Sequence, residues 1–251
     1  NGDGVIKTET NLPFVPDGEG NLAWRAAKLL LDEKGIRDGV TIKIRKFIPV
    51  AAGMAGGSTD AAAVLVGVNR MFDLGFTKKE LMERGVKLGA DVPYCIMRGT
   101  ALSEGIGEIL TELPAPPQCH LVIAKPQISV STKAVYGKLR VNELAPEEHP
   151  DIDGMMAAIK NGDLDGVIER LGNVLETVTV PDHPEIAEIK KVMMENGACG
   201  SLMSGSGPTV FGIYKDKEQA EKACQALRDA DGGRLTRQVY LTEFYNRKKA
   251  R

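Results

Sequence analysis

The sequence has no excess of basic residues, no charge block and no long apolar run. Its 32 Lys and Arg residues are balanced by 34 Asp and Glu residues, for a formal net charge of −2. This balance argues against proteins that bind nucleic acid or an anionic membrane surface. No segment approaches the ~20 apolar residues that a transmembrane helix needs. We therefore expect no nucleic-acid partner and no membrane partner.

The sequence also lacks the cysteine spacings of a zinc site. Its four cysteines are Cys95, Cys119, Cys199 and Cys224, and none of them belongs to a Cys-x-x-Cys pair. We expect buried free thiols in a reducing, cytoplasmic compartment, and no metal held by the protein alone.

What is present is the composition of a globular protein of 251 residues, with 43% hydrophobic and 26% charged residues. This length allows two domains. The run Leu113-Pro114-Ala115-Pro116-Pro117 is typical of a linker, which predicts one domain over residues 1–114 and another over residues 118–251. Both a monomer and a homodimer are compatible with the sequence.

Helices and strands do not alternate regularly along the chain. Asn21, Thr77 and Thr132 are candidate helix caps. This order favours an α+β protein in which each domain has a largely antiparallel sheet. We expect helices over residues 22–33, 58–71, 77–88, 132–139, 152–160, 164–175, 184–196 and 217–229. Strands are expected over residues 5–10, 40–46, 91–97, 101–110, 121–124, 209–214 and 237–244, and near residue 202.

The stretch PVAAGMAGGST, residues 49–59, is almost bare of large side chains and leads into a predicted helix. Small residues let a ligand reach backbone N–H groups, and a helix N-terminus attracts anions. The loop is therefore a candidate phosphate site, in which Ser58 and Thr59 could bond a phosphate oxygen or a water on Mg²⁺. The alternative is a flexible loop packed closely against a neighbouring helix. The stretch matches neither a Walker A motif nor Gly-x-Gly-x-x-Gly.

Two further stretches are candidate functional segments. The first is Gly200–Thr209, which contains Gly205-Ser206-Gly207, and the ordinary interpretation of this segment is a tight turn. The second is Gly89-Ala90-Asp91-Val92-Pro93, where one acidic residue lies among apolar neighbours. Asp91 can shape a turn, or it can accept a proton from a substrate hydroxyl.

Together, in their order along the chain, these three stretches resemble the GHMP kinases. The resemblance covers essentially the whole chain and is strongest to members that act on a cytidine-linked alcohol, through Leu88–Pro93 and Glu104-Gly105-Ile106-Gly107-Glu108. It implies a two-domain fold, with an N-terminal domain like domain 2 of ribosomal protein S5 and a ferredoxin-like C-terminal domain. It also implies a phosphotransferase that uses ATP and Mg²⁺ and acts on a small-molecule substrate.

The resemblance further implies a role for individual residues. Asp91 matches the catalytic aspartate that contacts the hydroxyl to be phosphorylated. On the substrate side, Thr132 would bond the substrate, Tyr136 would stack on cytosine, and Gly205 and Ser206 match the third family motif. The expected ATP-binding residues are Asn21, Lys46, Pro49, Val50, Ala51, Ala52, Gly53, Met54, Ala55, Gly56, Gly57, Ser58, Thr59 and Asp60.

The sequence departs from the family pattern in two ways. The family begins with a lysine in an Ala-Lys-hydrophobic-Asn context and a Gly-Tyr-His, and neither occurs at the start of this chain. We expect an incomplete chain rather than a true truncation, because a lost edge segment would leave sheet groups unpaired. The alternatives are a catalytically impaired nucleotide-binding fragment and a kinase for another small alcohol. The second departure is alanine at positions 51, 52 and 55, where many relatives carry glycine.

Overall fold

The computed structural model describes residues 4–245, which form two compact units. The first unit holds the described residues up to Val50 together with Ala55–Glu112. The second holds Ala51–Met54 and the described chain from Leu113 onward. The assignment of residues 1–114 and 118–251 to two domains stays a prediction. Within residues 4–245, no helix is both long enough and apolar enough to cross a membrane.

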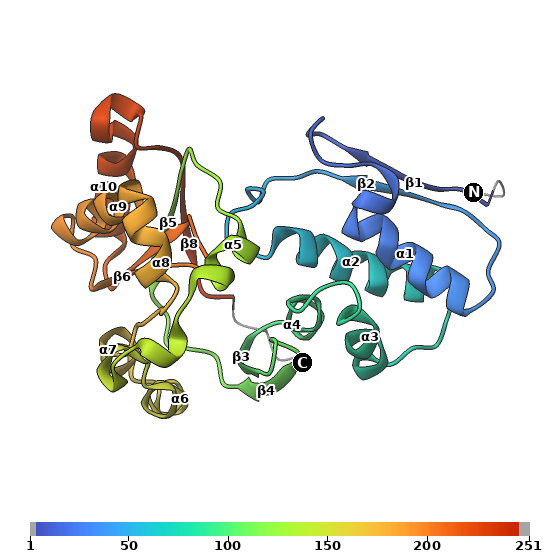
Figure 1. The fold of residues 1–251 in the computed structure, drawn as a ribbon, viewed down its shortest axis with the longest axis horizontal. Coiled ribbons are helices and arrows are strands. Elements are labelled where there is room, and N and C mark those ends of the chain that lie inside the picture. The colour runs from blue at the N-terminus through green and yellow to red at the C-terminus, as the bar shows by residue number, and fades with distance from the viewer. Residues whose placement is uncertain (1–3, 246–251) are drawn as a thin grey trace. The chain divides into compact units, whose positions relative to one another are not determined.

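The first unit is built on two helices that lie side by side, α1 (Leu22–Glu33) and α2 (Gly56–Met71) (Figure 1). Its core joins the apolar faces of these helices to those of α3 (Lys78–Gly85) and α4 (Val92–Met97). The strands of this unit are β1 (Ile6–Thr10), β2 (Val40–Ile44), β3 (Thr100–Glu104) and all but the last residue of β4 (Ile109–Leu113), and a 3-10 turn covers Gly18–Gly20.

The β1–β2 pair corrects the expectation of a largely antiparallel sheet in this half of the chain. The two strands run parallel, with Ile6 opposite Val40. Parallel neighbours need a long crossover connection, and α1 supplies it. Two expected caps are confirmed, because Asn21 accepts a bond from the N–H of Ala23 and Thr77 forms a capping box with Glu80.

The strand expected over residues 91–97 is wrong, because α4 occupies that segment. Val92, Pro93, Ile96 and Met97 are buried, which is a helical spacing within a short apolar run. Pro93 lies in the first turn, where its missing N–H costs nothing. The strand expected over residues 101–110 is instead two strands, β3 and β4, which pair as a two-stranded sheet around a turn with positive φ at Gly105 and Gly107.

The second unit has a four-stranded antiparallel sheet in the order β6-β7-β5-β8, as expected for this half. Its strands are β5 (His120–Pro126), β6 (Gly200–Met203), β7 (Val210–Tyr214) and β8 (Thr236–Glu243). Its helices are α5 (Thr132–Lys138), α6 (Ile152–Asn161), α7 (Leu164–Glu169), α8 (Glu176–Asp182), α9 (Pro184–Glu195) and α10 (Lys217–Asp229), with 3-10 turns at Val141–Glu143, Pro146–Glu148 and Ala230–Gly233.

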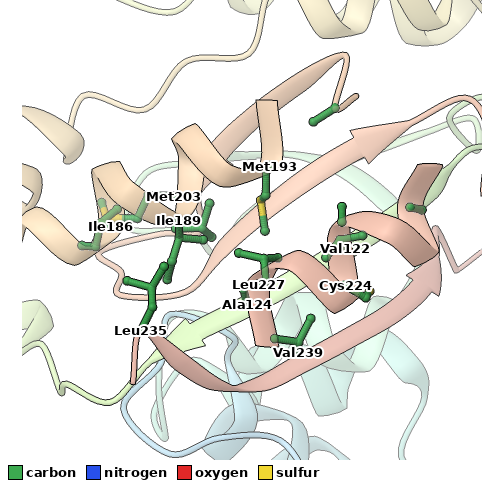
Figure 2. Packing of buried hydrophobic residues seen from close by; sticks show 14 of the residues in the cluster. Val122, Ala124, Ile186, Ile189, Met193, Met203, Cys224, Leu227, Leu235 and Val239 are labelled. Carbon is green, nitrogen blue, oxygen red and sulfur yellow. The ribbon is translucent and has the colours of Figure 1, made fainter. Parts of the chain in front are cut away.

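The main core of this unit lies between the sheet and the helices α9 and α10 (Figure 2). Ile189 and Met193 of α9 and Leu227 of α10 are fully buried there. On β5, Val122 and Ala124 contribute to this core, whereas Leu121 belongs to a smaller cluster with residues of α7. The alternation of β5 residues between two clusters shows that this strand is covered on both faces.

Three details of the second unit differ from expectation. The helix expected over residues 164–175 ends at Glu169, and the residues that follow include Gly172, a poor helix former. A separate helix, α8, begins at Glu176 and includes Pro181, a residue that argues against helix in a sequence. The cap of α5 is Ser131, so Thr132 is the first helical residue instead.

The four cysteines are free, as expected, but they are not all buried. Cys119 and Cys224 are buried, Cys95 is half-buried and Cys199 is exposed.

Candidate active site

The small-residue loop takes a backbone course that few side chains tolerate. Ala51, Gly53 and Ala55 all have positive φ, at 51°, 68° and 47°. A left-handed conformation costs alanine roughly 1–2 kcal/mol, so Ala51 and Ala55 are strained residues of this loop. Such strain is typical of ligand-binding loops. A Cβ on Gly53 would lie 2.2 Å from the carbonyl oxygen of Ser204, so this position has no room for a side chain.

The loop ends at the N-terminus of α2, where backbone donors are exposed. Ala55 is the N-cap residue and has no side-chain oxygen to bond the first turn. The backbone hydrogen bond that begins α2 runs from the N–H of Thr59 to the carbonyl of Ala55, at 2.9 Å. The Thr59 hydroxyl donates to the same oxygen at 3.0 Å. The N–H groups of Gly56, Gly57 and Ser58 precede that bond, and together they form an anion-binding end.

A buried lysine lies beside this helix end. The Lys46 side chain is only 6% exposed, and its Nζ is 2.5 Å from Oδ2 of Asp60. The same Nζ would be 3.0 Å from a Cβ on Gly56. Lys46 is therefore at the first turn of α2, next to the candidate phosphate loop. Its role near adenosine stays a prediction.

Asn11, which has no special signature in the sequence, fixes the backbone of Lys46. Its Oδ1 accepts from the Lys46 N–H at 2.6 Å, and its Nδ2 donates to the Lys46 carbonyl at 3.2 Å. A lone asparagine after a short strand is common in turns, so sequence reasoning misses it.

Asn21 is engaged within the fold. Its Oδ1 caps α1 through Ala23, and its Nδ2 donates to the carbonyl of Pro16, both at 2.9 Å. The side chain is buried with both polar groups occupied. Its expected contact with adenosine is a prediction that this geometry leaves untested.

Asp91 stands at the start of α4 and is exposed. Its carboxylate does not cap that helix, which leaves it available to a substrate hydroxyl. The first turns of α2 and α4 are close together, because the Thr59 hydroxyl is 3.5 Å from the Cys95 sulfur and a Cβ on Gly89 would be 4.0 Å from the Ser58 hydroxyl. Burial raises the pKa of the Cys95 thiol, so the thiol stays protonated. The first unit thus brings an exposed carboxylate and an anion-binding helix end into one neighbourhood.

The second unit brings together two of the residues expected on the substrate side. The hydroxyl oxygens of Thr132 and Ser206 are 2.8 Å apart. Ser206 is buried, whereas Thr132 and Gly205 are exposed. Tyr136 lies one turn after Thr132 on α5 and is 60% exposed, so its ring is accessible for stacking.

The middle of the small-residue loop contacts the Gly-Ser-Gly turn within the second unit. The Ser204 hydroxyl donates to the carbonyl of Gly53 at 2.8 Å, and the backbone at Gly205 lies within van der Waals distance of Gly53. The two small-residue stretches are therefore joined at their centres.

Among residues 4–245, no group of three or more His, Cys, Asp or Glu side chains is arranged to hold a metal ion. Mg²⁺ at a nucleotide site keeps several waters and takes few ligands from the protein besides those of the phosphates. The hydroxyls of Ser58 and Thr59, in the first turn of α2, are oxygen donors of the kind that such an ion accepts.

Comparisons with known proteins agree with this geometry. The model of the GHMP kinase N-terminal domain matches residues 21–99, and that of the GHMP kinase C-terminal domain matches residues 155–232. A 4-diphosphocytidyl-2-C-methyl-D-erythritol kinase of Lachnospira eligens is 53% identical over 96% of this chain and 82% of its own length. The chain belongs to the GHMP kinases. The expected family and two-domain fold are thereby confirmed.

Other relatives of this GHMP kinase have the same name as the Lachnospira eligens kinase. The kinase of Clostridium perfringens is 48% identical over 97% of the chain and 83% of its own length. A crystal structure of 4-(cytidine 5'-diphospho)-2C-methyl-D-erythritol kinase matches with a TM-score of 0.77 and 31% identity, over 95% of this chain and 82% of the other. A homoserine kinase from Cytophaga hutchinsonii reaches a TM-score of 0.81 over 95% and 81% of the two chains, but at 22% identity. That likeness shows the fold alone.

Proposed function

We propose that this GHMP kinase transfers the γ-phosphoryl group of ATP to the 2-hydroxyl of 4-diphosphocytidyl-2-C-methyl-D-erythritol, in the non-mevalonate route to isoprenoids. The observation that carries the proposal is identity of 48–53% to kinases of that name over nearly the whole chain. The anion-binding end of α2 and the exposed Asp91 supply the local chemistry that the reaction needs.

In this mechanism the first unit binds the triphosphate of ATP. The N–H groups of Gly56, Gly57 and Ser58 would donate to phosphate oxygens, and the partial positive charge of the helix end would favour their negative charge. The Lys46 ammonium lies beside Gly56 at the same end, paired with the carboxylate of Asp60. Mg²⁺ bound with the nucleotide would neutralise charge on the phosphates. Because phosphoryl transfer needs mainly positioning and charge stabilisation, a loop of backbone donors suits it.

Asp91 would act on the acceptor. Its carboxylate accepts a hydrogen bond from the substrate hydroxyl and orients the oxygen toward the γ-phosphorus. It takes the proton as the new P–O bond forms and the bond between the γ-phosphorus and the bridging oxygen of ADP breaks, so that ADP leaves. On the second unit, Thr132 and Ser206 would bond the substrate, and Tyr136 would stack on the cytosine ring. These roles follow the family resemblance residue by residue.

The test is an initial-rate assay of the full-length gene product with Mg-ATP. We expect turnover with 4-diphosphocytidyl-2-C-methyl-D-erythritol, and with homoserine or mevalonate no rate above the ATPase background. A rate with homoserine or mevalonate that exceeded the rate with the cytidine substrate would overturn the assignment.

A further inference from the structure

The segment from Asn173 to Thr179 bonds the Gly-Ser-Gly turn through three side chains spaced three residues apart. Asn173 Nδ2 donates to the carbonyls of Met203 and Gly205, at 2.9 and 2.8 Å. The orientation of this amide is fixed, because its Oδ1 accepts from the N–H of Leu175 at 3.0 Å. The Asn173 side chain thus bonds the residue before Ser204 and the residue after it.

The other two side chains bond the same turn from α8. Glu176 Oε1 accepts from the N–H of Met203 at 2.7 Å, and its Oε2 accepts from Lys190 Nζ at 2.6 Å. The Thr179 hydroxyl, on a residue only 1% exposed, donates to the carbonyl of Ser206 at 3.2 Å. These three side chains therefore bond the N–H of Met203 and the carbonyls of Met203, Gly205 and Ser206.

The turn has little space in which to move. A Cβ on Gly207, where φ is +86°, would lie 2.6 Å from the sulfur of Met203 and 3.4 Å from the methyl group of Thr179. Within this packing the Ser206 hydroxyl is 2.8 Å from that of Thr132. The distance between these two hydroxyls therefore depends on where α8 holds the turn.

We propose that Asn173, Glu176 and Thr179 are positioning residues of the kinase reaction. They hold residues 203–207 so that Gly205 and Ser206 meet the substrate beside Thr132, and they do not touch the substrate themselves. This proposal rests on the function proposed above, since the turn is a substrate-binding segment only if that function holds. It assigns a role to α8, which matches no motif of the sequence.

The sharpest test compares two threonines of α8. Thr179→Val removes the hydroxyl that bonds Ser206, and its matched control Thr177→Val removes a hydroxyl that bonds the nearby carbonyl of Val174. We expect Thr179→Val to raise the KM for the cytidine substrate by about 5- to 10-fold with kcat within about twofold. Thr177→Val and the conservative variant Thr179→Ser should keep the wild-type KM.

Asn173→Ala gives a second test at a less buried position and should raise the same KM at least as much. If Thr179→Val fails to fold, Asn173→Ala decides the proposal alone. A wild-type KM in Asn173→Ala, or a fall in melting temperature with no change in KM in either variant, would reduce these residues to fold stabilisers and overturn the proposal.

Failure of the proposed function gives a different pattern. In that case the wild-type enzyme would not turn over the cytidine substrate, and the same comparison of variants would be made on the KM for the alcohol that it does phosphorylate.

Discussion

The loop of residues 49–55 and the turn of residues 203–207 are both rich in small residues, but they are shaped by different means. The loop is shaped by its backbone, with left-handed Ala51, Gly53 and Ala55 leading into α2. The turn is shaped by side chains from elsewhere, namely Asn173, Glu176 and Thr179. Substitutions should therefore disturb the first within its own residues and the second from a distance.

The largest effect is expected outside both loops, at the residue that supplies chemistry rather than shape. Asp91→Asn keeps the size of the side chain and removes its charge and basicity. Because the carboxylate of Asp91 has no capping role in α4, the fold should be unchanged and kcat should fall by roughly 10²-fold or more. Steady-state kinetics with both substrates measure the effect, and circular dichroism checks the fold. An unchanged kcat would remove Asp91 from the mechanism.

The second largest effect tests the backbone-shaped loop. Gly53→Ala would place a Cβ 2.2 Å from the Ser204 carbonyl at a φ of +68°, so the loop must shift. We expect the KM for ATP to rise about tenfold or more, because even small misplacement of a binding group is costly.

The matched control for this change is Gly67→Ala. Gly67 lies inside α2, and the space that a Cβ would occupy there has no neighbouring atom within 4 Å. Alanine at this position should stabilise the protein by about 0.5–1 kcal/mol, and the KM for ATP should be unchanged. Equal KM values in the two variants would contradict a loop shaped by its own backbone.

A smaller effect is expected at the buried charge beside the loop. Asp60→Asn leaves the Lys46 ammonium, 6% exposed, without its carboxylate, so the free energy of unfolding should fall by about 1–3 kcal/mol. Urea denaturation measures this loss. The control Asp32→Asn breaks an exposed pair with Lys28 and should change stability by at most about 0.5 kcal/mol. Equal losses of unfolding free energy in the two variants would show that the buried pair of Lys46 stabilises the protein no more than the exposed pair of Lys28.

The contrast between the two loops also explains what the sequence can predict. The loop of residues 49–59 is visible in the sequence because its residue types are themselves unusual, and the caps at Asn21 and Thr77 are visible because caps are local. Asn173 and Glu176 have no such signature, because their partners lie about thirty residues away in the chain. No local pattern reports such a bond.

Errors in predicted elements have similar causes. Residues 91–97 are predicted as a strand because a short apolar run fits both a strand and a buried helix. The parallel direction of β1 and β2 depends on pairing across α1, which periodicity does not report. The roles of Asp91, Thr132 and Tyr136 come from resemblance to the family, since single exposed residues of these types have no signature of their own.

The most direct test of the central claim is a competition assay. The full-length enzyme would receive Mg-ATP and an equimolar mixture of 4-diphosphocytidyl-2-C-methyl-D-erythritol, homoserine and mevalonate, with products followed by mass spectrometry and phosphorus NMR. The account predicts a single new phosphomonoester, on the 2-hydroxyl of the cytidine-linked alcohol. Phosphorylation of either of the other alcohols instead would contradict it.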